Sequence, residues 1–256
     1  MRELRRQNAW IDGESLRGLD GRIIVRRILE DAPQVEMTYG DIPGGHGQRY
    51  LGRRRINRRV SIVIAIRELY DLSARARVVD AVNAWAKDGV LTVSYRPNQR
   101  LLVRRAGPAA TGDVRDYNAD IQIDFDAPAS PFWEDAFPAR LSLSGESGSG
   151  SVVVTGTAPG LAAVTVTPEA ALTALTVTAG ATAMAFEGLA IPAGQPVTID
   201  HDDHGYLRIA SGGASLLSKR TAASADELLG GPGPCACAFT ADAACQVDFA
   251  IRGRYL

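Results

Sequence analysis

The chain has 256 residues, of which 46% are hydrophobic and 22% charged, and its formal net charge is −1. This composition excludes a disordered chain and fits a globular protein of one large or two ordinary domains. No window approaches the roughly 20 apolar residues of a membrane-spanning helix, and residues 1–11 lack the apolar core of a secretory signal. We therefore expect no membrane partner.

The first third of the sequence is rich in strand signals. Residues 22–29, 35–39 and 60–66 are enriched in β-branched side chains. The interval 40–59 between the last two is basic and contains many turn residues, so it is interpreted as irregular.

One helix is predicted next, over about 71–88. Val78, Val82 and Trp85 recur at helical spacing, Asp71 can cap the start of the helix, and Gly89 follows its end. A β-hairpin is predicted directly after it, over about 90–105, with Arg96-Pro97-Asn98-Gln99 as its turn.

The segment 113–133 combines a strand with a sharp stop. Apolar and polar residues alternate up to Phe125, after which come the residues that we interpret as a domain junction: Pro128, Pro131, Phe132 and Trp133. Phe132 and Trp133 are expected to be buried there. The segment closes a predicted N-terminal domain, residues 1–140, which is α+β with one helix.

A second domain is predicted over 141–256. Residues 142–150 (SLSGESGSG) are typical of a loop or linker. Short strands follow, separated by turn residues at the spacing of a β-sandwich: 152–155, 163–167, 172–178, 184–186, 195–200, 206–210 and 246–251. The fold class is therefore mainly β.

Two clusters offer ligand chemistry. Asp200-His201-Asp202-Asp203-His204 could bind a transition metal, but it lies at the tip of an expected hairpin, and a solvated turn is the favoured interpretation. Cys235, Cys237 and Cys245 lack the spacing of a zinc site, and an odd number argues against a disulfide framework, so small buried residues are favoured. We expect no metal and no cofactor.

Arginines gather between the second and third strands. They are Arg49, Arg53, Arg54, Arg55, Arg58 and Arg59. Such a cluster can hold phosphates, or it can pair with carboxylates of a neighbouring subunit. Aromatic residues for base stacking are almost absent here, so subunit contact is favoured over dedicated nucleic-acid binding.

Catalysis finds little support in the sequence. It has three histidines and no recognised nucleophile, metalloprotease or redox motif. We predict that the protein is not an enzyme. Two alternatives stay open: a carbohydrate-binding module that uses the C-terminal sandwich, and a hydrolase that uses the Asp200–His204 cluster.

Three stretches carry a family resemblance, in order along nearly the whole chain. They are residues 19–28, residues 117–133, and residues 188–200 followed by 226–233 and a final strand ending RGRYL. Together they resemble the distal tail proteins (Dit) of siphovirus-type phages and phage-derived tail particles. The family often has Pro-Gly-Asn before its last strand pair, whereas this chain has Pro232-Gly233-Pro234, which affects the turn expected there.

The resemblance implies a structural protein of the tail tip or baseplate. Its N-terminal domain would form a ring, usually hexameric, and its C-terminal domain would be a galectin-like β-sandwich. The implied partners are the tail-tube protein, the tail-tip hub protein, and fibre or receptor-binding proteins. The implied location is the virion tail, assembled in the bacterial cytoplasm.

Overall fold

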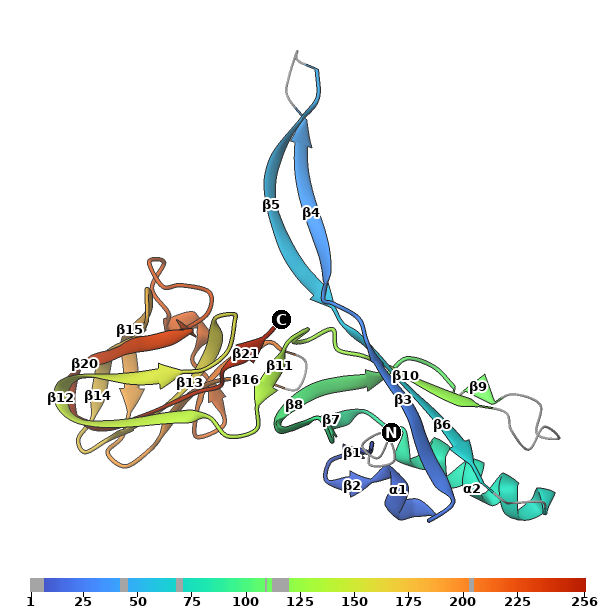
Figure 1. Ribbon diagram of the computed structural model, residues 1–256. Helices are drawn as coiled ribbons and strands as arrows, with labels where there is room; N and C mark the ends of the chain where they lie inside the picture. The colour runs from blue at the N-terminus through green and yellow to red at the C-terminus, as the bar shows by residue number, and fades with distance from the viewer. Residues whose placement is uncertain (1–6, 42–45, 68–70, 109, 112–119, 203–204) are drawn as a thin grey trace. The chain divides into compact units, whose positions relative to one another are not determined.

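The computed structural model describes residues 7–41, 46–67, 71–108, 110–111, 120–202 and 205–256. The chain divides into two compact units, unit 1 (Met1–Trp133) and unit 2 (Glu134–Leu256). Strands predominate in both, which confirms the predicted mainly β fold class (Figure 1). Among the described helices, none is long and apolar enough to cross a membrane.

Unit 1 is built on a sheet whose strands follow the order β2-β1-β7-β8-β10-β6-β3, with β9 beside β10. The bounds are β1 (Ala9–Ile11), β2 (Glu14–Ser15), β3 (Ile23–Glu30), β6 (Arg59–Ile66), β7 (Gly89–Val93), β8 (Arg96–Arg105), β9 (Ala110–Thr111) and β10 (Ile121–Asp126). Strand β6 is the apolar centre, since most of its residues are buried between its neighbours β10 and β3.

Helix α2 (Leu72–Trp85) covers part of this sheet, and the short helix α1 (Leu16–Leu19) lies near it (Figure 1). The predicted cap is confirmed, because the Asp71 carboxylate accepts the Ser73 N–H at 2.9 Å. At the other end of the helix, Trp85 packs edge-to-face on Phe125 of β10, with ring centroids 6.2 Å apart. The apolar side of α2 that the sequence pattern predicted thus packs against β10.

The β7–β8 hairpin is present, but its predicted turn is wrong. The turn residues are Ser94 and Tyr95, and Val93 pairs directly with Arg96. Pro97 therefore lies within β8, where the pairing with β7 shifts register between Leu91 and Val93. A proline is tolerated at such an irregularity because its missing N–H is not needed for the ladder.

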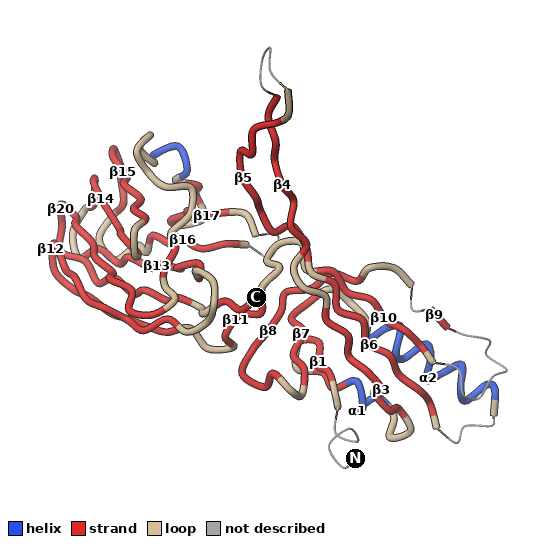
Figure 2. The backbone as a smooth tube through the Cα atoms, turned by 45° about the horizontal axis from the view of Figure 1, so that its top comes forward, coloured by secondary structure: helices blue, strands red, loops and turns tan. Residues whose placement is uncertain are grey.

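Strands β4 (Gln34–Asp41) and β5 (Gln48–Asn57) pair only with each other among the described residues, and we call this hairpin the arm (Figures 1 and 2). The prediction of an irregular 40–59 is wrong for β5. Cross-strand pairing with β4, from Gln34↔Asn57 to Asp41↔Gln48, satisfies the backbone of this basic run. The composition of residues 40–59 gives no sign of this pairing, because the hydrogen-bonding partners belong to a different strand, β4.

Part of the predicted strand in 113–125 lies outside the described residues, namely 113–119. The described part is β10, which alternates buried Ile121, Ile123 and Phe125 with the more exposed Gln122 and Asp124, in the predicted phase. Strand β11 (Trp133–Asp135) crosses the boundary of the two units.

Unit 2 is a sheet that curls around one core. Its path is β15-β14-β20-β13-β16-β17-β18, with β12 beside β20 and β19 beside β13 (Figures 1 and 2). The bounds are β12 (Ala139–Val154), β13 (Gly160–Pro168), β14 (Leu172–Ala179), β15 (Thr182–Ile191), β16 (Val197–His201), β17 (Leu207–Ser211), β18 (Ala214–Ser215), the 3₁₀ turn η2 (Leu217–Lys219), β19 (Leu229–Gly230), β20 (Gly233–Ile251) and β21 (Arg254–Tyr255).

The long strands β12 and β20 pair along their whole length, from Ala139↔Ile251 to Val154↔Gly233. The predicted linker at 142–150 is therefore wrong, since it is the middle of β12. Its glycines serve close packing: a Cβ on Gly148 would come 2.9 Å from the Phe239 ring, and one on Gly150 would come 3.0 Å from Leu141 Cδ2. Glycine is present at these positions because a larger side chain would clash with Phe239 or Leu141, and not because the segment needs to be flexible.

Candidate functional site

The arm presents a set of exposed apolar side chains on one face. Val35, Met37 and Tyr39 lie at alternate positions of β4, and the Tyr39 and Tyr50 rings meet edge-to-face with centroids 6.0 Å apart. Each of these four side chains is between 46% and 53% exposed. Exposed clusters of Tyr and Met are characteristic of surfaces that bind other proteins.

Arginines stand beside these apolar residues. Directly opposite residues of an antiparallel pair share a face, so Arg53 lies beside Met37 and Arg55 beside Val35. The Arg55 guanidinium also lies over the Phe132 ring, 5.8 Å from its centroid. We call Val35, Met37, Tyr39, Tyr50, Arg53 and Arg55 the arm face.

On the opposite side of the arm, side chains contact other residues of the arm itself. Arg54 forms an ion pair with Glu36 at 2.5 Å, although both side chains remain well exposed. Leu51 packs over Gly40, where an added Cβ would come 3.0 Å from Leu51 Cδ1. Arg49 pairs across from Gly40 on this side.

The two remaining arginines of the predicted contact set lie at the base of the arm and differ from the others. Arg59 forms a two-pronged pair with Asp126, with Nε–Oδ1 at 3.0 Å and Nη2–Oδ2 at 3.2 Å. The hydrogen bond from Arg59 holds the pKa of Asp126 below its usual range. Arg58 is only 2% exposed, and burial lowers its pKa despite the nearby Glu30. The six arginines that the sequence grouped together thus lie in three places: on the arm face, on the opposite side of the arm, and at the base of the arm.

Next to Arg58, Glu30 organises a polar cluster. Its carboxylate accepts hydrogen bonds from Tyr95 Oη, from Arg96 Nη2 at 3.2 Å and from Trp133 Nε1 at 3.0 Å. Arg96 also lies over the Trp133 ring, 5.2 Å from its centroid. Burial, followed by the bond to Glu30, raises the pKa of Tyr95. Sequence reasoning missed this cluster because Glu30, the adjacent pair Tyr95-Arg96, and Trp133 come from three places more than 30 residues apart along the chain.

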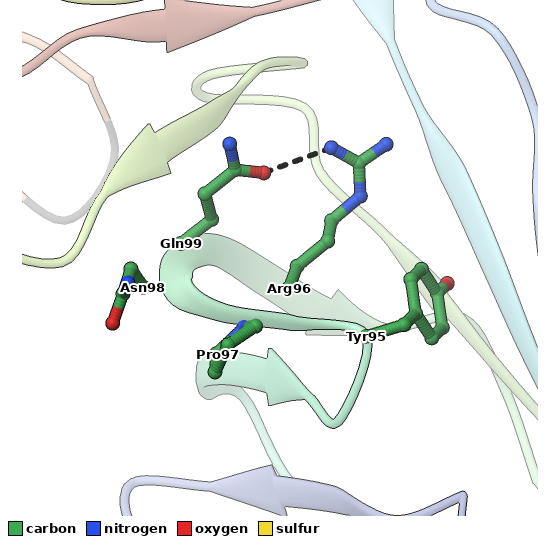
Figure 3. Close-up of a pocket in the computed structure, with 5 residues that line it drawn as sticks. All are labelled: Tyr95, Arg96, Pro97, Asn98 and Gln99. Atoms are coloured by element: carbon green, nitrogen blue, oxygen red, sulfur yellow. Dashed lines mark hydrogen bonds between the residues drawn. The ribbon is translucent and has the colours of Figure 1, made fainter. Parts of the chain in front are cut away.

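A shallow pocket of about 450 Å³ lies beside the cluster (Figure 3). It is lined by Tyr95, Arg96, Pro97, Asn98 and Gln99, and Arg96 Nη1 donates to Gln99 Oε1 at 2.8 Å. The Arg96 guanidinium is already engaged by Glu30 and Gln99, so the pocket presents no free charged group from this residue and makes a weak ligand site.

The residues of the predicted junction are unevenly buried. Trp133 is fully buried and Pro131 is buried, whereas Phe132 is half-buried and Pro128 is exposed. The Trp133 ring is held by Glu30 and Arg96, both of unit 1. Its position is therefore that of a core residue of unit 1.

Residues Asp200 to Asp202 lie at the end of the β16–β17 hairpin, whereas Asp203 and His204 of the predicted cluster lie outside the described residues. His201 ends β16, and burial lowers its pKa. The turn is closed by Asp202, whose carboxylate accepts the Tyr206 N–H at 2.9 Å. Among the described residues, no group of three or more His, Cys, Asp or Glu side chains could hold a metal ion.

The three cysteines of β20 are buried, and none of them is in a disulfide. Burial, together with the neighbouring Cys235, raises the pKa of the Cys237 thiol to about 12, and burial also raises the pKa of Cys245. Thiols of this kind are packed side chains and poor nucleophiles.

Comparison with known proteins gives a match in fold. No protein-family model matches the chain, and no curated protein sequence does. The Dit protein (gp 19.1) of phage SPP1, described as a paradigm of the hub adsorption apparatus in phages that infect Gram-positive bacteria, has a similar structure: the TM-score is 0.66 at 13% identity, over 96% of this chain and 98% of that one. A chain of the phage p2 baseplate in its activated conformation with Sr gives 0.52 at 11% identity, over 96% and 97%.

These similarities cover both units. The resemblance to distal tail proteins that the three sequence stretches suggested is therefore confirmed as a resemblance of fold.

Proposed function

We propose that this protein is a structural component of a phage or phage-like tail tip, in which copies form a ring between the tail tube and the tail-tip hub. The observation that carries the proposal is the match of fold over nearly the whole chain to SPP1 Dit and to a chain of the p2 baseplate. A hexameric ring, contacts to the tail-tube and hub proteins, and attachment of fibre or receptor-binding proteins are the expectations that follow. The virion tail, after assembly in the bacterial cytoplasm, is its proposed location.

The arm face supports a contact between copies. It combines aromatic, Met and Arg side chains, which are the residue types that dominate binding energy at protein interfaces. In addition, unit 1 has 22 basic against 17 acidic residues, and unit 2 has 6 against 12. A basic arm and an acidic unit on the same chain suit a head-to-tail contact, the kind of contact that closes rings.

The test is the oligomeric state of the full chain, measured by native mass spectrometry and negative-stain imaging. Measurements are made alone and with the tail-tube and hub proteins of the same particle. The double variant Arg53→Glu/Arg55→Glu should abolish the ring, because charge reversal at a desolvated contact costs several kcal/mol. Arg22→Glu/Arg208→Glu is the matched control, since it reverses two exposed arginines that are not part of the arm hairpin.

A ring in the wild type and in the control, with monomers in the arm variant, is the expected result. A wild-type chain that stays monomeric even with both partner proteins would overturn the proposal. If the ring still forms after the arm arginines are reversed, the proposal of a ring stands, but the proposal that the arm face makes the contact between copies is refuted.

A further inference from the structure

Arg58 is a buried cation whose hydrogen-bonding capacity is not used. The residue is only 2% exposed and lies between the end of β5 and the start of β6. Within the described part of the chain, neither its Nε nor its Nη1 has an acceptor. A guanidinium stays charged in proteins, so its burial without acceptors is costly. Such a group calls for a partner that the chain itself does not supply.

The strand pairing fixes the position of Arg58 beside Glu30. Glu30 of β3 lies directly opposite Val60 of β6, and Arg58 comes two residues before Val60. Arg58 is therefore a diagonal neighbour of Glu30 on the same face of the sheet. The main chain holds it there, because Ala127 N donates to Arg58 O at 2.8 Å.

Glu30 is already saturated with hydrogen bonds from other residues. Its Oε1 accepts from Tyr95 Oη and from Arg96 Nε at 3.3 Å. Its Oε2 accepts from Arg96 Nη2 at 3.2 Å and from Trp133 Nε1 at 3.0 Å. A carboxylate offers about four lone-pair positions, and these four bonds use them. Glu30 thus attracts Arg58 electrostatically but has no lone pair left for it.

The charges of this cluster do not cancel. Arg58 and Arg96 each carry one positive charge, and Glu30 carries one negative charge. Tyr95 stays neutral, because burial, followed by the bond to Glu30, raises its pKa. Two positive charges and one negative charge leave a surplus of one. The partner that suits Arg58 is therefore an acceptor with a single negative charge.

The burial of Arg58 restricts the size of that partner. A phosphate or the carboxylate of another protein needs wide access, which a residue exposed by only 2% does not give. A halide ion needs little more room than a water molecule, and polar buried sites commonly hold water. Tyr95 and Arg96, whose charges act on Arg58, also line the shallow pocket of Figure 3. The cluster therefore faces solvent on that side, from which a small ion can enter.

We propose that Arg58 binds a chloride ion inside unit 1. The ion accepts hydrogen bonds from one edge of the guanidinium and cancels the surplus charge of Arg58, Arg96 and Glu30. Because the Nε and Nη1 hydrogens point from different edges of the planar group, a water molecule bonds to the other edge. The site lies at the base of the arm and does not depend on the ring proposed above.

The test measures the stability of unit 1 against chloride concentration at constant ionic strength. Sodium gluconate is replaced stepwise by sodium chloride, because gluconate has the same charge but is too large for the site. Urea unfolding of the full chain is followed by tryptophan fluorescence, since all three tryptophans lie in unit 1. The test variant is Arg58→Met, which removes the charge and the donors. The control is Arg49→Met, which removes an exposed arginine of the arm.

The wild-type chain should become more stable as chloride replaces gluconate. A ligand that binds only the folded chain raises the folding equilibrium constant in proportion to its concentration above the dissociation constant, hence about tenfold for each tenfold increase in chloride. Arg49→Met should show the same dependence, and Arg58→Met should show none.

A second measurement keeps the proposal testable even if Arg58→Met does not fold. Crystals of the wild-type chain soaked in bromide should show an anomalous-scattering peak within hydrogen-bond distance of the Arg58 guanidinium. Three results would overturn the proposal: equal chloride dependence in the wild type and Arg58→Met, no change in wild-type stability when chloride replaces gluconate, or only water beside Arg58 in the bromide-soaked crystals.

Discussion

Removal of the Trp133 side chain should strongly destabilise unit 1. Its ring is fully buried, its Nε1 donates to Glu30 at 3.0 Å, and Arg96 lies 5.2 Å from its centroid. A buried tryptophan removes about 150 to 250 Å² of surface from water, which is worth about 4 to 6 kcal/mol at 25 cal/mol per Å². Because the cavity relaxes in part, Trp133→Ala should lower the free energy of unfolding by about 3 to 5 kcal/mol.

A second substitution separates the polar from the apolar contribution. Trp133→Phe keeps a ring beneath Arg96 but removes the donor to Glu30. Glu30 retains its bonds from Tyr95 and Arg96, so the loss should be about 1.5 to 3 kcal/mol, clearly less than for alanine.

The sequence supplies a selective assay, because all three tryptophans (Trp10, Trp85 and Trp133) lie in unit 1. Urea unfolding followed by tryptophan fluorescence therefore reports unit 1 even if the two units unfold separately. In both variants Trp10 and Trp85 remain as reporters. Phe137→Ala is the control, since that side chain is 82% exposed and should change stability by less than about 0.5 kcal/mol.

The reasoning is refuted if Trp133→Ala lowers the free energy of unfolding by less than about 1 kcal/mol. It is also refuted if the phenylalanine variant is as unstable as the alanine variant, because the apolar ring would then contribute nothing.

Three further predictions concern other parts of the chain. The pKa of Asp126 is lowered by Arg59, so its ionised form stabilises the fold above the unfolded pKa of about 3.9, and this contribution is lost as the pH falls through the lowered folded pKa. Asp126→Asn should therefore cost stability at neutral pH and little in strong acid, and an equal cost at both in urea titrations would contradict the ion pair. A Cβ on Gly160 would come 2.0 Å from the Arg252 carbonyl oxygen, so Gly160→Ala should destabilise unit 2 by about 1 to 3 kcal/mol. The measurement is thermal unfolding followed by far-ultraviolet circular dichroism. Gly21→Ala is the control and should leave stability unchanged, because nothing lies within 4 Å of a Cβ added there. The cysteines should react with a thiol reagent only after unfolding, because burial raises the pKa of Cys237 to about 12; rapid reaction of the native chain would show that β20 is not packed as described.

Local patterns predicted those elements whose signal lies within a few neighbouring residues. The capped helix around Val78, Val82 and Trp85 and the alternation of Ile121, Ile123 and Phe125 were both predicted correctly, because a helical or strand period repeats within one element. The ordered stretches of family resemblance likewise anticipated the fold that the comparison with SPP1 Dit shows.

The errors arose where distant residues decide. Residues 142–150 have the composition of a linker but form the middle of β12, because β20, about 90 residues later, supplies the paired backbone and leaves room only for glycine. The basic interval before β6 became the strand β5 because β4 lies beside it. In both cases the hydrogen-bonding partner is remote in sequence, and composition within the segment does not report it.

The same division holds for the candidate sites. The sequence by itself determined a mainly β chain of two parts, one basic and one acidic, with arginines gathered before β6. Only the tertiary structure decided that Arg53 and Arg55 share an exposed face with Met37 and Val35, and that Arg58 is buried. It also decided that, among the described strands, β12 pairs only with β20. Charge and hydrophobicity belong to residues, whereas a face, an edge and a buried cluster exist only once separate strands have been brought together.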